Sequence, residues 1–237
     1  MGLTFYERVG FEGRRPSPFS WRIRYALAHK EIDFDVHPVR FADVETIRRL
    51  SGQHLTPIID HDGQVTHETW DIANYLEDRF PDRPSLFGGA TGRAIPRFIN
   101  DWASSQLSPP LRHVIYADFP AVLDPGDRVY FRSTRERDLG MSLEAACADP
   151  EKKLAAFQQA CAPLERCLST QPYLCGGAPA YADYIVFSIF QWARLGSPKE
   201  VVAKPSALAD WRSRMIALYD HLGDHFLGYP AGSLERS

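Results

Sequence analysis

The stretch TPIIDHDGQVTHETWDIANYLEDRF, residues 56–80, contains an opening proline, a predicted hairpin and a predicted helix in succession. TPIID and QVTH flank a turn that includes Asp62-Gly63, and an Asp-Gly pair between apolar runs is a strong hairpin signal. From Ile72 to Phe80, apolar residues recur at spacings of three and four, which is typical of one helix face. This part of the chain therefore predicts two antiparallel strands followed by a helix.

The residues before this stretch also alternate in type. Residues 3–9 are rich in β-branched and aromatic side chains and predict a strand, whereas residues 21–30 show helical periodicity. Residues 32–39 alternate between apolar and polar side chains, and residues 42–50 predict a short helix. The predicted element order is therefore β α β α β β α.

This order, with a proline opening its last hairpin, is typical of a thioredoxin-like fold, so we predict such an α/β domain over residues 1–82. Thr56-Pro57 lies where such folds carry a cis-proline. In the cis form, the Thr56 backbone faces an extended peptide and can pair with it like an added strand. The alternative is a proline that only ends the pairing of an edge strand.

The second part of the chain has a different pattern. Residues 80–92, FPDRPSLFGGATG, are rich in proline and glycine and predict a linker, after which the pattern is wholly helical. Residues 154–168 have one apolar face, in which Pro163 should kink or divide the helix. Residues 181–195 are apolar nearly all round and predict a buried central helix. The alternative is that their aromatic side chains form a substrate-binding cluster. We therefore expect an all-α domain over residues 93–230.

The composition argues against several kinds of binding partner. A net charge of -3 disfavours a nucleic-acid partner, because nucleic-acid binders are more often basic. No apolar run approaches the roughly 18 residues that cross a bilayer, so we expect a cytoplasmic protein without a membrane partner. The cysteines lack zinc-site spacing, and His221 and His225 lack a third ligand, so we predict no metal site.

Glu68 and Thr69 directly precede the helical pattern of residues 70–80. Thr69 can cap this helix while its N–H and hydroxyl groups face an anion, and Glu68 can hold an ammonium group. A cation and a carboxylate this close together describe the α-amino acid end of a γ-glutamyl group. A plain helix N-cap is the alternative.

Ser17 begins the stretch SPFSWRIRYALAHK, residues 17–30, and lies at the start of a helix, where negative charge is favoured. Lowering a thiol pKa by two units requires about 2.7 kcal/mol, whereas a helix end offers roughly 0.3–1 kcal/mol. A hydrogen bond to a charged group adds about 1.5–3 kcal/mol. We therefore predict that Ser17 donates a hydrogen bond to a thiolate. We also predict that Ser17, Thr56-Pro57 and Glu68-Thr69 together form a glutathione site. A plain N-cap role, or Ser20 as the donor, is the alternative.

Residues 119–140 are too long for a simple connection, so we expect either a lid or an ordered excursion. Three arginines in this segment, Arg132, Arg135 and Arg137, alternate with acidic residues. They predict a solvated charged face, and a lid that touches an anion is the alternative.

The chain resembles cytosolic glutathione transferases over its whole length. Among them it looks most like the group that contains the bacterial lignin β-etherases and the fungal etherase-like transferases. The residues that carry the resemblance are SPFSWRIRYALAHK, TPIID, HETWDIANYLEDRFPDRPSLF, YFRSTRERDLGMSLEA and GGAPAYADYIVF. The resemblance implies a thioredoxin-like domain, an α-helical domain and a homodimer.

The resemblance also implies glutathione as the co-substrate. Thr56 and Pro57 would hold its cysteinyl backbone, Glu68 and Thr69 its γ-glutamyl end, and Ser17 would lie near its thiol. Related omega-type enzymes carry a cysteine in place of this serine, so thiol–disulfide exchange through an enzyme cysteine is disfavoured.

Two positions depart from the family pattern. Leu55 stands where many relatives place a lysine or arginine for the glycine carboxylate of glutathione, so Gln53 or His54 must substitute. Ala180 stands three residues before Asp183, at a position that often has a hydroxyl or amide side chain, and it removes half of a capping box.

The leading hypothesis is a glutathione transferase whose bound thiolate attacks an electrophilic carbon of a small hydrophobic, aromatic substrate. By resemblance, this reaction could be displacement at the β-carbon of an aryl ether. Between the domains, we expect four residues to line the substrate site: Phe19, Trp21, Tyr116 and Phe119. One alternative is a non-catalytic binder of apolar ligands or glutathione conjugates, and another is a glutathione-dependent reductase.

Overall fold

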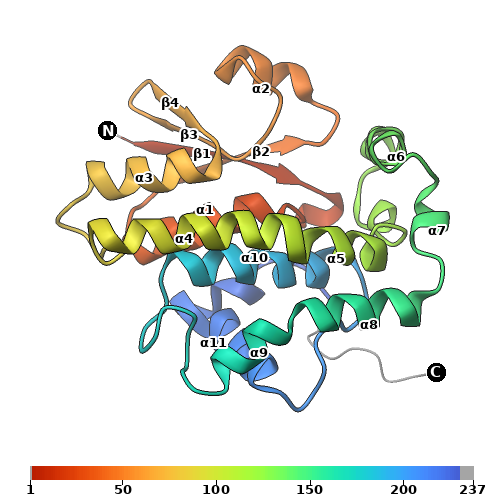
Figure 1. Ribbon diagram of the computed structural model, residues 1–237. Helices are drawn as coiled ribbons and strands as arrows, with labels where there is room; N and C mark the ends of the chain where they lie inside the picture. Colours follow the sequence, from red (N-terminus) through yellow and green to blue (C-terminus); the bar gives the residue numbers. More distant parts are fainter. Residues whose placement is uncertain (1, 230–237) are drawn as a thin grey trace.

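The computed structural model describes residues 2–229, and Figure 1 shows a small sheet-containing domain packed on a larger helical one. The predicted thioredoxin-like α/β domain followed by an all-α domain is confirmed. The domain bounds 1–82 and 93–230 stay a prediction, and their positions 1 and 230 lie outside the described residues.

Four strands form one mixed sheet in the order β2-β1-β3-β4. They are β1 (Leu3–Val9), β2 (Asp35–Arg40), β3 (Ile58–His61) and β4 (Gln64–His67). α1 (Pro18–His29) connects β1 to its parallel partner β2, and the β3–β4 hairpin adds the antiparallel pairings. The remaining elements of this domain are η1 (Phe11–Gly13), α2 (Val44–Ser51) and α3 (Thr69–Arg79).

The alternation of side chains in β1 places a core on each face of the sheet. Leu3 and Phe5 belong to the main core, which α1, α3 and α10 (Tyr181–Gly196) share. Tyr6 points to the opposite face and packs on a smaller cluster that includes Ile47 of α2. The sheet therefore rests on the helical domain through α1 and α3, while α2 covers its outer face.

Buried charges connect β1 and α3 to α1. Glu7 is fully buried and accepts hydrogen bonds from Arg15, at 2.7 Å, and from Arg24. Lys30 is also fully buried and donates to Glu77 at 2.9 Å. Buried charges are tolerated where each finds a partner, so these contacts tie α1 and its flanking residues to β1 and α3.

The second domain consists of helices around α10, all of whose residues are buried. The predicted buried central helix is thus confirmed, and Pro163 lies just after the break between α8 and α9. The other elements are α4 (Ala90–Trp102), η2 (Ala103–Leu107), α5 (Ser108–Ile115), η3 (Phe119–Val122), α6 (Pro125–Leu139), α7 (Leu143–Ala146), α8 (Pro150–Ala160), α9 (Ala162–Leu168), α11 (Ala207–His221) and η4 (Leu222–Asp224). η2 is a π-helical turn that joins α4 to α5.

The segment 119–140 is an ordered excursion made of η3 and α6. The buried Asp127 accepts a hydrogen bond from the Ala42 N–H at 2.8 Å, which ties α6 to the sheet domain. The Phe131 ring stacks on Phe119, with centroids 5.1 Å apart. α6 is therefore held on both domains by these contacts.

Asp183 organises the start of α10. Its buried carboxylate accepts hydrogen bonds from the N–H groups of Leu174, Cys175 and Ala180 and from the indole of Trp211. The carboxylate half of the predicted capping box is therefore present, although Ala180 lacks a side-chain acceptor for the other half. Three donors from the preceding loop and one from α11 therefore depend on this single side chain.

We expect Asp183→Ala to lower the free energy of unfolding by about 3 kcal/mol or more, because each buried donor left without an acceptor costs about 1–3 kcal/mol. Urea denaturation followed by circular dichroism measures this loss. Asp210→Ala, at an exposed position in the first turn of α11, is the control and should change the free energy by about 1 kcal/mol or less. Equal losses in the two variants would contradict the role of Asp183.

Within residues 2–229, no helix has both the length and the apolar character needed to cross a membrane. The cytoplasmic location expected from the sequence stays a prediction.

Candidate active site

Two cavities meet at the N-terminus of α1. Cavity 1, of about 550 Å³, lies between the loop before β3, the start of α3 and α4. Cavity 2, of about 480 Å³, lies between the start of α1, α5 and α6. Phe19, Arg22, Leu55 and Thr56 line both cavities, so a molecule that fills cavity 1 can present one end to cavity 2.

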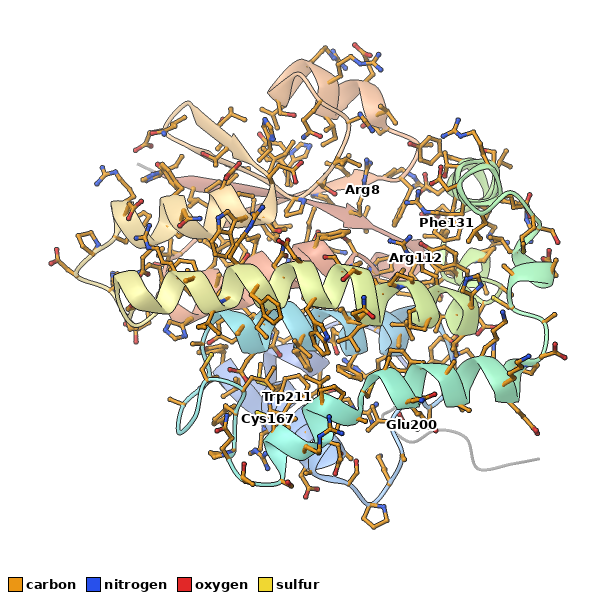
Figure 2. All side chains as sticks on the ribbon, in the orientation of Figure 1. Arg8, Arg112, Phe131, Cys167, Glu200 and Trp211 are labelled. Carbon is orange, nitrogen blue, oxygen red and sulfur yellow. The ribbon has the colours of Figure 1, made fainter. Side chains whose placement is uncertain are left out.

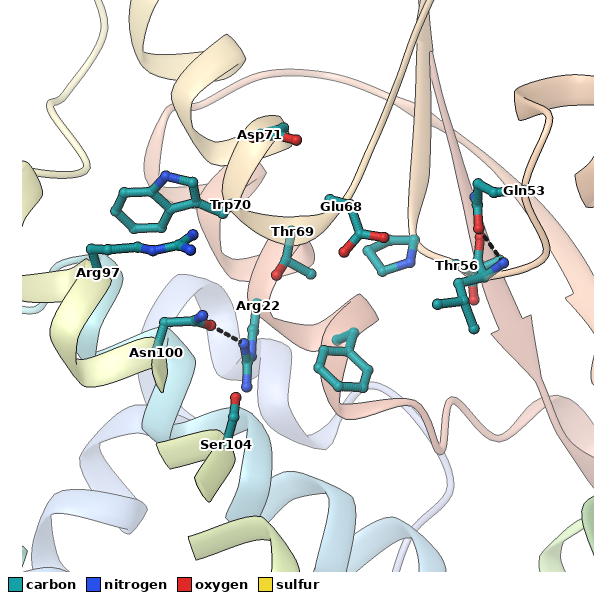
Figure 3. A pocket seen from close by; sticks show the side chains of 13 residues that line it. Arg22, Gln53, Thr56, Glu68, Thr69, Trp70, Asp71, Arg97, Asn100 and Ser104 are labelled. Atoms are coloured by element: carbon teal, nitrogen blue, oxygen red, sulfur yellow. Dashed lines mark hydrogen bonds between the residues drawn. The ribbon is translucent and has the colours of Figure 1, made fainter. Parts of the chain in front are cut away.

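Four of the residues predicted to bind glutathione come together in cavity 1. Thr56, Pro57, Glu68 and Thr69 all line it, and the Thr56-Pro57 bond is cis, as expected for the fold. In Figure 3, Glu68 and Thr69 face the same space from the start of α3. Glu68 has a φ of 66°, and non-glycine residues in this unfavourable region occur preferentially at functional sites.

The helical domain fixes the start of α3. The Tyr181 hydroxyl, at the beginning of α10, donates to the Thr69 carbonyl at 2.8 Å. The Tyr181 and Trp70 rings also pack together, with centroids 6.2 Å apart. The N–H groups at this helix end are therefore held in place by a residue more than a hundred positions away in the sequence.

Ser17 is the N-cap of α1 and also lines cavity 2. Its hydroxyl oxygen accepts the Ser20 N–H at 3.4 Å. A serine hydroxyl accepts through its lone pairs and donates its own hydrogen, so the cap leaves this hydrogen available to a group in the cavity. The two roles considered for Ser17 are therefore compatible.

Ser20 is placed differently. Its side chain is 1% exposed, its hydroxyl has no hydrogen-bond partner within the described residues, and it lines neither cavity. A group in cavity 2 therefore reaches Ser17 more directly than Ser20.

Gln53 and His54 also lie at the cavities, with different surroundings. The Gln53 amide bonds to the N–H of Leu55 and, at 2.7 Å, to its carbonyl oxygen, so its polar atoms are already used. His54 lines cavity 2, and its carbonyl accepts from Arg8 at 3.1 Å. Leu55 itself is 54% exposed at the rim.

Three of the four aromatic residues predicted to contact substrate line cavity 2, namely Phe19, Tyr116 and Phe119. Phe119 fits only because α10 has a glycine opposite it: a Cβ at Gly196 would lie 2.0 Å from the ring. Trp21 is a correction to the prediction. Its indole is 1% exposed, donates to the Arg15 carbonyl at 2.7 Å and packs in the core, away from the lining of either cavity.

Arg22 lies between the two cavities and was not predicted as a site residue. It is 2% exposed and donates to Asn100 of α4 at 2.6 Å and to Ser188 of α10 at 3.2 Å (Figure 3 shows the first bond). Burial lowers the pKa of Arg22 to about 10, so the guanidinium remains charged at neutral pH. The sequence placed Arg22 on a helix but gave no sign that α4 would face it.

Cavity 1 contains a second cation that the sequence did not indicate. Figure 3 shows Arg97 of α4 beside the Trp70 ring. Its guanidinium carbon lies 5.4 Å from the ring centroid. Ser104, in the π-helical turn η2, lines the same cavity. α4 and η2 thus form a polar wall opposite the start of α3.

Within residues 2–229, no group of three or more histidine, cysteine or acidic side chains is arranged to hold a metal ion. The His225 ring is bonded to the Asp220 carbonyl at 2.6 Å. Burial raises the pKa of the Cys161 thiol to about 12, so it is not poised as a thiolate.

Comparison with known proteins identifies the family. Residues 16–79 match the model for the glutathione S-transferase N-terminal domain, and residues 94–217 match the model for the C-terminal domain. A glutathione transferase from Phanerochaete chrysosporium, GSTFuA3, superposes with a TM-score of 0.82 at 25% identity, over 93% of this chain and 98% of its own.

Two further relatives differ in their named activities. The β-etherase LigF from Sphingobium superposes with a TM-score of 0.64 at 21% identity, over 92% of this chain and 96% of its own. A probable maleylacetoacetate isomerase from Caenorhabditis elegans is 33% identical over 96 residues, which is 39% of this chain and 45% of the relative. This match thus spans less than half of that relative. The two domain models together confirm the predicted resemblance: the chain belongs to the glutathione S-transferase family, whose co-substrate is glutathione.

Proposed function

We propose that the protein binds glutathione across cavity 1, stabilises its thiolate at the N-terminus of α1 and transfers the sulfur to an electrophilic carbon in cavity 2. The observation that carries this proposal is the meeting of both cavities at Phe19 and Thr56, beside the Ser17 hydroxyl. A tripeptide lying in the first cavity would present its thiol to a substrate in the second.

The γ-glutamyl end would lie at the start of α3. The Glu68 carboxylate would hold its ammonium group, and the N–H groups and hydroxyl at Thr69 would receive its carboxylate, since a helix N-terminus favours an anion. The Thr56 backbone precedes the first residue of β3, Ile58, so it lies outside the strand and faces cavity 1. It would pair with the cysteinyl residue of glutathione in the manner of an added strand.

The glycine carboxylate would lie toward His54. The side chain of Gln53 is closed on the Leu55 backbone, which favours His54 of the two candidates. Behind the His54 backbone lies the Arg8 guanidinium, a buried cation on the cavity 2 side. It would supply the positive charge that relatives place at the Leu55 position.

We expect Ser17→Ala to raise the pKa of bound glutathione by about one to two units, because a hydrogen bond to a charged group contributes about 1.5–3 kcal/mol and one pKa unit is about 1.4 kcal/mol. An ultraviolet thiolate titration of the binary complex measures this midpoint. Ser20→Ala is the matched control and should leave it unchanged, since Ser20 lines neither cavity. If Ser17→Ala leaves the midpoint where it is, Ser17 has no part in activation.

We expect Glu68→Gln to weaken glutathione binding about tenfold or more, because an ion pair with the ammonium is lost while the shape is kept. Calorimetry with S-methylglutathione measures the affinity. The same titration with an analogue that lacks the γ-glutamyl amine is the control, because wild type and variant should then bind it almost equally. If the Glu68→Gln protein still prefers S-methylglutathione over the amine-free analogue as strongly as the wild type does, the ammonium group is bound elsewhere.

The walls of cavity 2 favour an aromatic electrophile. Tyr116, Phe119 and Trp192 pack edge to face, with centroids 5.6–6.4 Å apart, and aromatic rings prefer such contacts. For an aryl ether, the thiolate would form a carbon–sulfur bond at the β-carbon while the carbon–oxygen bond breaks and a phenolate leaves. Steady-state turnover with a panel of electrophiles separates this enzyme from a non-catalytic binder, and release of glutathione disulfide would instead indicate the reductase.

We also propose a homodimer that covers the outer face of α4. Ile95 and Phe98 are 62% and 66% exposed there, beside an apolar groove of about 810 Å³ between α4 and α9. A second copy of the chain would remove this apolar surface from water.

We expect Phe98→Asp to halve the molar mass measured by light scattering, because a buried unpaired charge opposes the dimer interface. Val129→Asp is the control: Val129 is 72% exposed on α6, and the mass should not change. A wild-type monomer at micromolar concentration would contradict the proposal.

A further inference from the structure

Cavity 2 is strongly cationic although the chain as a whole is acidic. Five arginines and one aspartate line it within the described residues, a net charge of +4 with His54 neutral, whereas the whole chain carries -3. The arginines are Arg8, Arg22, Arg112, Arg135 and Arg137. Aromatic walls alone would suit a neutral substrate, so this charge requires its own explanation.

Carboxylates of the protein offset only part of this positive charge. Burial lowers the pKa of Arg8, and the negative charges of Asp127 and Asp43 oppose this shift. Asp138 lies 3.4 Å from Arg135 and 3.9 Å from Arg137, so it offsets one charge between two arginines. Arg8, Arg22 and Arg112 form no ion pair with a carboxylate in the part of the chain that the structure describes. For the buried Arg8 and Arg22, an anion supplied by a ligand would offset part of the cost of burying the charge, whereas Arg112 is exposed and accessible to such an anion.

The unpaired cations converge from both domains. Arg8 comes from β1 and is 7% exposed, whereas Arg112 comes from α5 and reaches solvent. Figure 2 labels both beside Phe131, where α6 closes this end of the molecule. Arg112, Tyr116 and Arg135 all line this one cavity.

Glutathione accounts for only part of the charge. In the proposed function its thiolate would lie near Ser17 and its glycine carboxylate near His54 and Arg8. These two anions would leave the cavity with a net charge of +2, carried on the side of α5 and α6. Arg112 of α5 and Arg135 of α6 line that side of the cavity together with Tyr116 and Phe119 of the aromatic wall.

We propose that the electrophile is an aromatic carboxylate, with its ring against Tyr116 and Phe119 and its carboxylate bound by Arg112 together with Arg135. This inference rests on the proposed transferase function and specifies its substrate class. An arginine guanidinium matches a carboxylate in a two-point hydrogen-bonded arrangement that a neutral amide does not reproduce. The site therefore selects for charge as well as for aromatic character.

The test compares two electrophiles that differ in this charge: para-chloro-meta-nitrobenzoate and the corresponding benzamide. For each, kcat/KM with glutathione is divided by the rate of the uncatalysed reaction, which removes the difference in intrinsic reactivity. We expect the wild-type protein to prefer the acid by about tenfold or more. In Arg112→Gln this preference should fall to about twofold or less, mainly through KM for the acid.

Arg49→Gln is the matched control, since Arg49 is 73% exposed, paired with Glu45 on α2 and outside both cavities. It removes one positive charge and should keep the wild-type preference for the acid. Loss of the preference in this control as well would mean that net charge, and not Arg112, selects the substrate, and would overturn the assignment.

The outcomes separate this inference from the proposed function. If both compounds are turned over with equal corrected efficiency, or if Arg112→Gln lowers both in proportion, the carboxylate site is wrong while the transferase function stands. If neither is turned over, the transferase function fails for these compounds. Calorimetry with meta-nitrobenzoate and meta-nitrobenzamide on the S-methylglutathione complex then decides: tighter binding of the acid, lost in Arg112→Gln, supports the site, and equal affinity overturns it.

Discussion

The packing of α1 between the sheet and α10 is the constraint on which the rest of the molecule depends. Tyr25 on α1 donates to the Met215 carbonyl of α11 at 2.9 Å, and Arg22 reaches both α4 and α10. Because the body of α1 is buried among both domains, its N-terminus has a fixed direction. Ser17 and the two cavities around it take their positions from this packing, so the chemistry of the site depends on the core.

The parts of the site that the sequence predicted are those whose geometry is local. Ser17 directly precedes α1 and caps it, and Glu68 directly precedes α3, whose first residue is Thr69. Capping rules therefore located both helix starts without knowledge of the tertiary fold, although no side chain caps α3 and Thr69 does not have the predicted capping role. The element order of the first domain was predictable for the same reason, since each strand or helix has its own periodicity. The cis bond before Pro57 could be predicted once that element order was recognised.

The parts that the sequence did not predict depend on contacts between distant segments. Nothing near Arg22 indicates that Asn100 will face it, and Arg8 and Arg112 are on elements of different domains. Trp21 was placed in the wrong environment because helical periodicity gives a side chain's face but not what covers that face. The different surroundings of the α6 arginines also depend on contacts between distant segments. Arg132 pairs with Glu144 at the surface, whereas Arg135 lines cavity 2.

The π-helical turn η2 has a consequence for how this scaffold can diversify. It lies between α4, which lines cavity 1 through Asn100, and α5, which lines cavity 2 through Arg112. Such turns occur mostly as single π-bulges inside α-helices and are frequent at functional sites. Because successive residues of an α-helix are about 100° apart, inserting or deleting one residue there would rotate α4 against α5 and so change how cavity 2 is oriented relative to cavity 1.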